Sequence, residues 1–149
     1  MGKIFLLPPK KIGVIWLAVI RPGENLVVNP KVRASLSFAD DNLHRDIYVS
    51  EVAQLVRLSR SRFSDLFKSE LGMSFTQYLK KARMEKARQL LETTFEPIKA
   101  IAVEVGYNDP AYFEREFKKS YRSTPSQHRA DYLARIALIK QARKNRRIL

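Results

Sequence analysis

Polar and basic side chains recur at helical spacing opposite two pairs of phenylalanines, in segments near residues 59–71 and 109–121. Phenylalanines four residues apart share one face of an α-helix, so burial of their rings would expose the opposite face. In the first segment, that face carries Ser61, Ser64, Asp65 and Lys68. In the second, it carries Ala111, Glu114, Arg115 and Lys118, with Pro110 and Tyr112 near the start. These groups offer hydrogen bonds and charge, since an arginine fork can donate two bonds to guanine and a carboxylate can accept one from cytosine.

The sequence contains no visible arrangement of acid, base and nucleophile. It has neither a phosphate-binding glycine loop nor a GxSxG turn. His44 and His128 are far apart and lack the spacing of zinc ligands. Asp40 and Asp41 are predicted to be a solvated helix end rather than a catalytic pair. We therefore expect neither enzymatic activity nor a cofactor or metal ion.

The chain is strongly basic. It has 28 Lys and Arg against 15 Asp and Glu, which gives a net charge of +13 in 149 residues. This excess predicts a polyanionic partner, either a nucleic acid or an anionic membrane surface. Cysteine is absent, which excludes disulfides and thiolate metal sites and fits a cytoplasmic protein.

Helix start signals predict an all-α protein that positions these exposed faces. The expected starts, in chain order, are Pro30, Ser50, Ser59, Ser74, Pro97 and Asp109 with Pro110. The helix that begins at Pro30 has an apolar stripe of Val32, Leu36, Ala39 and Leu43. Gly72 is expected to end the helix that begins at Ser59, and a long helix follows to about Leu91.

An internal repeat shows how these helices are organised. Phe63, Phe67 and Lys68 recur as Phe113, Phe117 and Lys118, an offset of 50 residues. The same offset pairs Ser59 with Asp109, Leu71 with Tyr121, Ser74 with Thr124, and Gln77 with Gln127, while Ala53 and Val56 match Ala102 and Val105 at an offset of 49. Each copy has a short helix, a tight turn, an N-cap and a second helix, as in the helix-turn-helix unit. Two ordinary helical hairpins are the alternative, which the extent of the repeat and the basic charge disfavour.

Residues 30–129 resemble the DNA-binding domain of the AraC/XylS family of transcription regulators. In the second unit, the resemblance rests on Ile98, Ile101-Ala102, Val105-Gly106-Tyr107-Asn108-Asp109, Tyr112-Phe113, Arg115, Phe117-Lys118-Lys119, Thr124-Pro125 and Arg129. In the first unit and the connecting helix, it rests on Leu58-Ser59-Arg60-Ser61, Phe63, Leu66-Phe67-Lys68, Leu71-Gly72-Met73-Ser74, Tyr78-Leu79, Arg83, Glu85, Ala87 and Leu90-Leu91. Arg57 and Arg122 depart from the pattern, because the family often has glycine there. If these positions need a positive φ, each arginine costs about 1 kcal/mol.

The resemblance implies two helix-turn-helix subdomains joined by a long linker helix, which bind specific double-stranded DNA sites and regulate transcription as an activator. Implied base contacts are Ser61, Ser64, Asp65, Pro110, Ala111, Tyr112 and Arg115; implied phosphate contacts are Ser59, Arg60, Arg62, Lys68, Lys118, Thr124 and Arg129. It further implies RNA polymerase as a partner, no membrane, and a monomer or weak dimer. A linker of roughly 18 residues would span about 27 Å, so two recognition helices could enter successive major grooves, which repeat about every 34 Å.

The two ends of the chain are less defined. Residues 1–29 are predicted to be an N-terminal arm with β or irregular structure, or the remnant of another domain; the apolar run Ile12–Ile20 is too short to span a membrane. Residues 30–130 form the predicted DNA-binding domain, and residues 131–149 form a basic tail. The tail could bind DNA backbone, remain solvated, or lie on a membrane; the first two are favoured because no second membrane anchor is visible.

Two alternative functions stay open. The chain could be a sequence-tolerant architectural or antagonist DNA-binding protein, or an interaction fragment that no longer binds DNA. The ratio of specific to nonspecific DNA affinity separates the first of these from a site-specific regulator. The sequence names neither the target promoter, the direction of regulation nor an effector, and it fits either a stand-alone regulator or the C-terminal part of a longer one.

Overall fold

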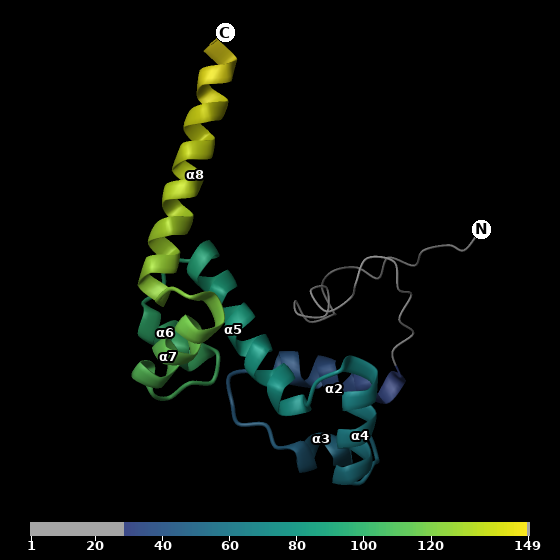
Figure 1. Ribbon diagram of the computed structural model, residues 1–149. Coiled ribbons are helices and arrows are strands. Elements are labelled where there is room, and N and C mark those ends of the chain that lie inside the picture. The colour runs from purple at the N-terminus through teal and green to yellow at the C-terminus, as the bar shows by residue number, and fades with distance from the viewer. Residues whose placement is uncertain (1–28, 149) are drawn as a thin grey trace, which may run out of the picture. The chain divides into compact units, whose positions relative to one another are not determined.

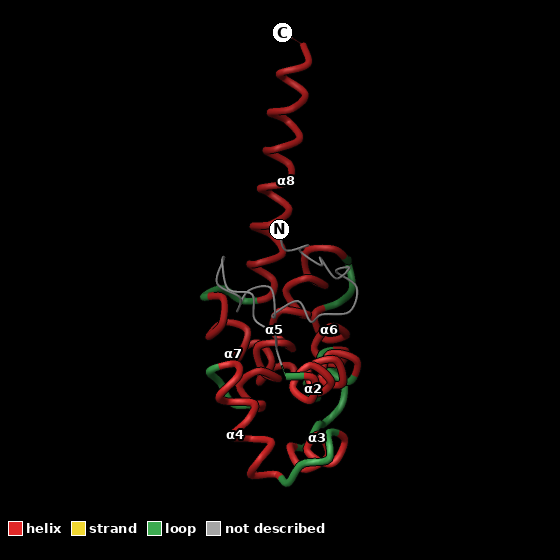
Figure 2. Tube along the Cα trace, turned by 90° about the vertical axis from the view of Figure 1, so that its right-hand side faces the viewer, coloured by secondary structure: helices red, strands yellow, loops and turns green. Residues whose placement is uncertain are grey.

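The computed structural model describes residues 29–148, and all secondary structure in that range is α-helical (Figures 1 and 2). The helices are α2 (Pro30–Asp41), α3 (Val49–Leu55), α4 (Arg60–Leu71), α5 (Phe75–Thr93), α6 (Ile98–Glu104), α7 (Pro110–Tyr121) and α8 (Pro125–Ile148). The predicted all-α fold is therefore confirmed over these residues. The predicted N-terminal arm lies outside them, apart from residue 29.

The chain divides into two compact units, and the boundary between Glu85 and Lys86 falls inside α5. The first unit contains α2, α3, α4 and the start of α5. The second contains the end of α5, then α6, α7 and α8. Each unit thus has the helix order that the repeat predicted, with α5 as the expected linker.

Aromatic rings form the centre of the first unit. Phe63 and Phe67 of α4 are fully buried, and their ring centroids lie 5.6 and 5.4 Å from that of Phe75. The Tyr78 ring lies 5.9 Å from Phe67. The predicted stripe on and just after α2 completes this core with Val32, Leu36, Ala39 and Leu43, all buried.

The second unit repeats this packing. Phe113 and Phe117 of α7 are fully buried, as are Ile101 and Ala102 of α6. The Phe117 ring lies 5.6 Å from the imidazole of His128. His128 therefore takes the position that Tyr78 holds in the first unit, 50 residues earlier.

A polar contact ties the first helix of each unit to its last. In the first unit, the Tyr78 hydroxyl donates to Asp40 Oδ1 at 3.0 Å; in the second, His128 Nε2 lies 2.9 Å from Glu92 Oε1. Burial raises the pKa of Asp40 to about 6, although the Tyr78 hydrogen bond opposes the shift. The prediction of a solvated helix end agrees with Asp41, which is exposed, but was wrong for Asp40, which is partly buried and bonded to a residue 38 positions away.

Two arginines act in the same way. Arg83 on α5 donates to the carbonyl oxygens of Leu43 and Arg45, at 3.1 and 2.6 Å. Arg129 on α8 donates to those of Leu91 and Glu96, at 3.3 and 2.8 Å. In each unit, an arginine on the last helix therefore holds backbone carbonyls at or after the end of the first helix.

Helix α3 begins two residues earlier than an N-cap at Ser50 would place it. Its N-cap is Tyr48, which makes no side-chain capping bond, so the prediction of Ser50 as N-cap was wrong. Ile47 and Val52 are both buried in the core of the first unit, and they occupy the two positions of a hydrophobic staple. Apolar burial fixes this helix start in place of a polar cap.

Matching capping boxes precede α5 and α8, at residues that the repeat pairs with one another. The Gln77 N–H donates to Ser74 Oγ at 3.2 Å, and the Ser74 N–H donates to Gln77 Oε1 at 3.0 Å. Thr124 and Gln127 make the same pair of bonds before α8. Both last helices therefore start with reciprocal side-chain caps.

The residues predicted to form a basic tail belong to α8. This helix runs unbroken from Pro125 to Ile148, so the predicted boundary at residue 130 lies inside it. Figure 1 shows its C-terminal half extending beyond the helices of its own unit. The tail's cations are exposed, namely Arg135, Lys140, Arg143, Lys144, Arg146 and Arg147. Among the described helices, none is long and apolar enough to cross a membrane.

Replacement of either central phenylalanine should destabilise the fold severely. Phe67→Ala and Phe117→Ala each remove a fully buried ring, and each should lower the free energy of unfolding by about 3–5 kcal/mol. Urea denaturation followed by circular dichroism measures this. Phe95→Ala is the matched control, because Phe95 is 86% exposed and its loss should change stability by about 0.5 kcal/mol or less. If a buried variant melted like the wild type, the proposed repeat of the core would be wrong.

Candidate nucleic-acid interface

Two helix pairs, α3–α4 and α6–α7, have the form of helix-turn-helix units. Ala53 on α3 and Ala102 on α6 are both buried. Because alanine adds only a methyl group to the backbone, each short helix can approach the longer helix after it closely.

Each short helix ends in the same backbone motif. The Leu58 N–H donates to the Ala53 carbonyl at 2.9 Å, and the Tyr107 N–H donates to that of Ala102 at 2.8 Å. In a second bond, the Arg57 N–H donates to the Gln54 carbonyl at 3.0 Å. In the other unit, the Gly106 N–H donates to the Val103 carbonyl at the same distance. These two bonds define the Schellman motif, which places one left-handed residue after the helix.

Left-handed residues occupy two positions in each unit, and these positions are equivalent between the units. In the turns, φ is +57° at Arg57 and +86° at Gly106. After α4 and α7, φ is +70° at Gly72 and +60° at Arg122. The positive φ considered for both arginines is therefore present, and each equivalent pair has one glycine and one arginine.

The predicted N-caps of α4 and α7 are confirmed. Ser59 Oγ accepts from the Arg62 N–H at 3.3 Å. Asp109 Oδ1 accepts from the N–H groups of Ala111 and Tyr112, at 2.9 and 3.2 Å. These bonds fix where each helix begins, and therefore which of its residues face outward.

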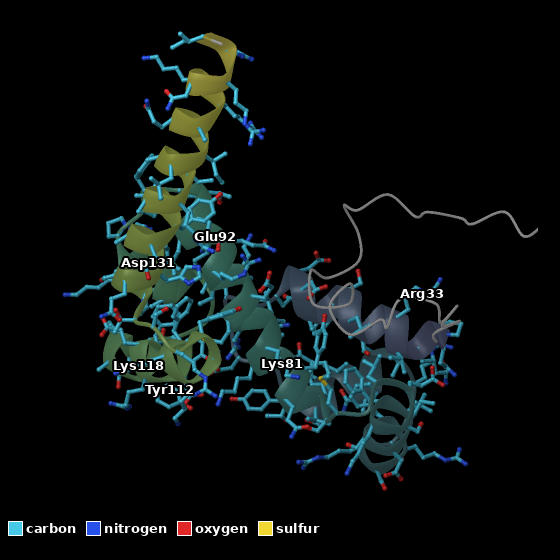
Figure 3. All side chains as sticks on the ribbon, turned by 45° about the horizontal axis from the view of Figure 1, so that its top comes forward. Arg33, Lys81, Glu92, Tyr112, Lys118 and Asp131 are labelled. Atoms are coloured by element: carbon cyan, nitrogen blue, oxygen red, sulfur yellow. The ribbon has the colours of Figure 1, made fainter. Side chains whose placement is uncertain are left out.

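The structure brings the predicted base-contacting residues together on two exposed helix faces. On α4, Ser61, Ser64 and Asp65 are exposed; on α7, Ala111, Tyr112 and Arg115 are exposed and Pro110 is partly buried. The Ser64 hydroxyl donates to the Arg60 carbonyl at 2.9 Å. Figure 3 shows Tyr112 and Lys118 projecting from α7 on the side away from the C-terminal half of α8.

The predicted phosphate contacts divide into two groups. Arg60, Arg62, Lys68 and Lys118 are exposed on α4 and α7, while Ser59 and Thr124 are helix caps. Arg129 differs, because its guanidinium already donates to two backbone carbonyls of the protein. The sequence did not reveal this structural role, since the carbonyls lie 33 and 38 residues away.

Two further features of α7 were missed. The Arg115 Cζ lies 5.7 Å from the centroid of the Tyr112 ring, a spacing of three residues that helical geometry could have indicated. Glu116 is 2% exposed, and its Oε1 accepts from Lys119 Nζ at 2.9 Å. Within residues 29–148, no cluster of His, Cys, Asp or Glu could hold a metal ion.

Comparison with known proteins identifies this architecture. A family model described as a helix-turn-helix domain matches residues 52–131, more than half of the chain. The arabinose operon regulatory protein of Salmonella typhimurium is 38% identical over 117 residues, which cover 76% of this chain and 41% of that protein. The lactose operon transcription activator of Staphylococcus xylosus is 37% identical over 103 residues, covering 69% and 37%. The chain thus spans less than half the length of these relatives.

Solved structures share the fold. The C-terminal domain of AraT, a response regulator from Geobacillus stearothermophilus, matches with a TM-score of 0.67 and 37% identity, covering 70% of this chain and 88% of that one. The DNA-binding domain of the global transcriptional factor AdpA, solved in complex with a target DNA, matches with a TM-score of 0.68 and 28% identity, covering 72% and 96%. Fold and site therefore define a helix-turn-helix protein. The chain belongs to the AraC/XylS family of DNA-binding domains, which is not a family of enzymes.

Substitution of either left-handed arginine by glycine should stabilise the fold, although glycine usually destabilises a protein. Arg57→Gly and Arg122→Gly should each raise the free energy of unfolding by up to about 1 kcal/mol, because glycine adopts positive φ without steric cost. Arg33→Gly is the matched control: Arg33 lies inside α2, where the same change should lower stability by about 1 kcal/mol. Thermal and urea unfolding of the three variants measures this. Equal destabilisation by all three changes would show that the arginines are not strained.

Proposed function

We propose that this chain binds specific double-stranded DNA sites and regulates transcription, with α4 and α7 as recognition helices in successive major grooves. The observation that carries the proposal is the repeated helix-turn-helix unit with an exposed polar face on each second helix, in a chain of net charge +13. The similarity to the AdpA domain solved with its target DNA supports it.

The exposed side chains suggest distinct roles. On α7, we assign Arg115 to guanine, whose O6 and N7 accept two hydrogen bonds, and Ala111 to a thymine methyl group. On α4, we assign Asp65 to cytosine N4, because a carboxylate is a hydrogen-bond acceptor that phosphates repel. Arg60, Arg62, Lys68 and Lys118 are assigned to phosphates, which position the protein without selecting a sequence.

The names of the relatives suggest the wider role. One relative is named as an operon regulatory protein and another as a transcription activator. We infer that this chain acts in the cytoplasm, activates a promoter and contacts RNA polymerase there. With one helix-turn-helix unit in each half of the chain, a monomer or weak dimer can occupy two grooves.

A second candidate function is sequence-tolerant DNA binding, which the six exposed cations of α8 after Asp131 favour. These cations lie on the part of α8 that extends away from Tyr112 and Lys118 on α7 (Figure 3). Specific binding to bases should therefore depend on α4 and α7, whereas α8 could add only affinity that is independent of sequence.

Salt tests the electrostatic part of the proposal. If six to eight phosphates are neutralised, the logarithm of affinity should fall with the logarithm of salt concentration, with a slope of about −5 to −7. Fluorescence anisotropy with a labelled duplex measures the slope. A slope near zero would contradict binding through the exposed basic residues.

Selection of sites from a random duplex library tests specificity, because the two candidate functions predict different outcomes. The wild type should enrich a motif, whereas even enrichment of all sequences would favour sequence-tolerant binding. Arg115→Ala should weaken binding to the enriched site by about 1–3 kcal/mol and relax preference at one or two base pairs. Lys118→Ala should weaken binding to all sequences by similar factors and reduce the magnitude of the salt slope by about one. If Arg115→Ala enriched the same motif as the wild type, Arg115 would contact the DNA backbone and not a base.

A further inference from the structure

The Arg115 guanidinium lies over the Tyr112 ring on the exposed face of α7. The Arg115 Cζ lies 5.7 Å from the centroid of the Tyr112 ring, within the distance at which the ring quadrupole attracts a cation. Among residues 29–148, no hydrogen bond or ion pair holds Arg115 to another residue. The Tyr112 ring is therefore the contact that orients this guanidinium in the free protein.

The Tyr112 ring is in turn supported by the core. Its centroid lies 5.8 Å from that of Tyr107, which is 7% exposed. The Tyr107 ring lies 5.6 Å from the fully buried ring of Phe113. The Tyr112 N–H also donates to Asp109 at the helix N-cap. A series of three rings thus connects the exposed guanidinium to the interior of the second unit.

The first unit has no counterpart of this arrangement. At the repeat offsets of 50 and 49 residues, Arg62, Asp65 and Leu58 occupy the positions of Tyr112, Arg115 and Tyr107. Both the cation and the two rings are therefore replaced there, although the buried phenylalanines are retained. The stack is a property of α7, and packing of the shared core does not require it.

We propose that Tyr112 is a positioning residue that holds Arg115 for contact with a guanine, and this rests on the proposed function of α7. A ring that covers one face of the planar guanidinium leaves the N–H donors in its plane free to point outward. Those donors match the O6 and N7 acceptors of guanine in the major groove. Tyr112 then acts through Arg115 and not as a separate base contact, which was the role that the family resemblance implied.

Site selection with Tyr112→Leu, Tyr112→Phe, Arg115→Ala and the double variant Tyr112→Leu/Arg115→Ala tests the inference. Tyr112→Leu should reduce preference about two- to fivefold at the base pair that Arg115→Ala relaxes, the range expected for an exposed cation–π contact. Tyr112→Phe should keep the wild-type preference at that base pair, because the ring is retained and only the hydroxyl is lost. The double variant should be no less selective at that base pair than Arg115→Ala. Tyr48→Leu, which removes a tyrosine that is 67% exposed and lies on neither α4 nor α7, should keep the motif.

The outcomes separate this inference from the proposed function. If the wild type enriches no motif, the proposed function fails and the inference fails with it. If the wild type enriches a motif but Tyr112→Leu leaves preference unchanged, or changes it at another base pair, only the inference is overturned. The second of these results would make Tyr112 a base contact in its own right.

Nuclear magnetic resonance of the DNA-free protein supplies a readout that general destabilisation would not produce. The Arg115 side-chain protons should be shifted upfield by the ring current, and the shift should vanish in Tyr112→Leu and persist in Tyr112→Phe. Arg115 resonances that are identical in the wild type and Tyr112→Leu would overturn the stack in solution, whatever the DNA-binding results.

Discussion

Burial of two phenylalanines on one side of each recognition helix is the interaction on which the other features depend. Phe63 and Phe67 on α4, and Phe113 and Phe117 on α7, are fully buried. An isolated helix of 12 residues is only marginally stable in water, so this packing supplies most of the stability of α4 and α7. Since the rings fix one face of each helix inward, they also determine which side chains face outward. Core packing and the exposed interface are therefore set by the same residues.

The left-handed turns before and after these helices are subordinate to that packing. Arg57 and Arg122 adopt left-handed conformations at positions where the other unit has Gly106 and Gly72. A left-handed residue other than glycine costs about 1–2 kcal/mol, less than the 3–5 kcal/mol lost when a buried phenylalanine is truncated. The core can therefore maintain the turn geometry even without glycine, which explains why both units keep the same backbone motif with different residues.

Local patterns made most of the fold and the exposed faces predictable. The phenylalanine spacing and the caps at Ser59 and Asp109 act within one helix, so the sequence reveals them directly. Features that depend on distant partners were missed: Asp40 accepts a hydrogen bond from Tyr78, and Arg129 donates to the carbonyls of Leu91 at the end of α5 and of Glu96 after it. The start of α3 was also misplaced, because a buried apolar pair positions it where a polar cap was expected.

The two units have kept their interiors and diverged on their exposed faces. The buried phenylalanines match at an offset of 50 residues, yet Asp65 and Arg115, which are equivalent by the same offset, carry opposite charges. A carboxylate accepts hydrogen bonds and a guanidinium only donates them, so the two side chains cannot favour the same base edge. Under the proposed function, Asp65 on α4 and Arg115 on α7 therefore contact different bases, a cytosine and a guanine. The two units then offer different hydrogen-bonding groups to DNA around the same buried core.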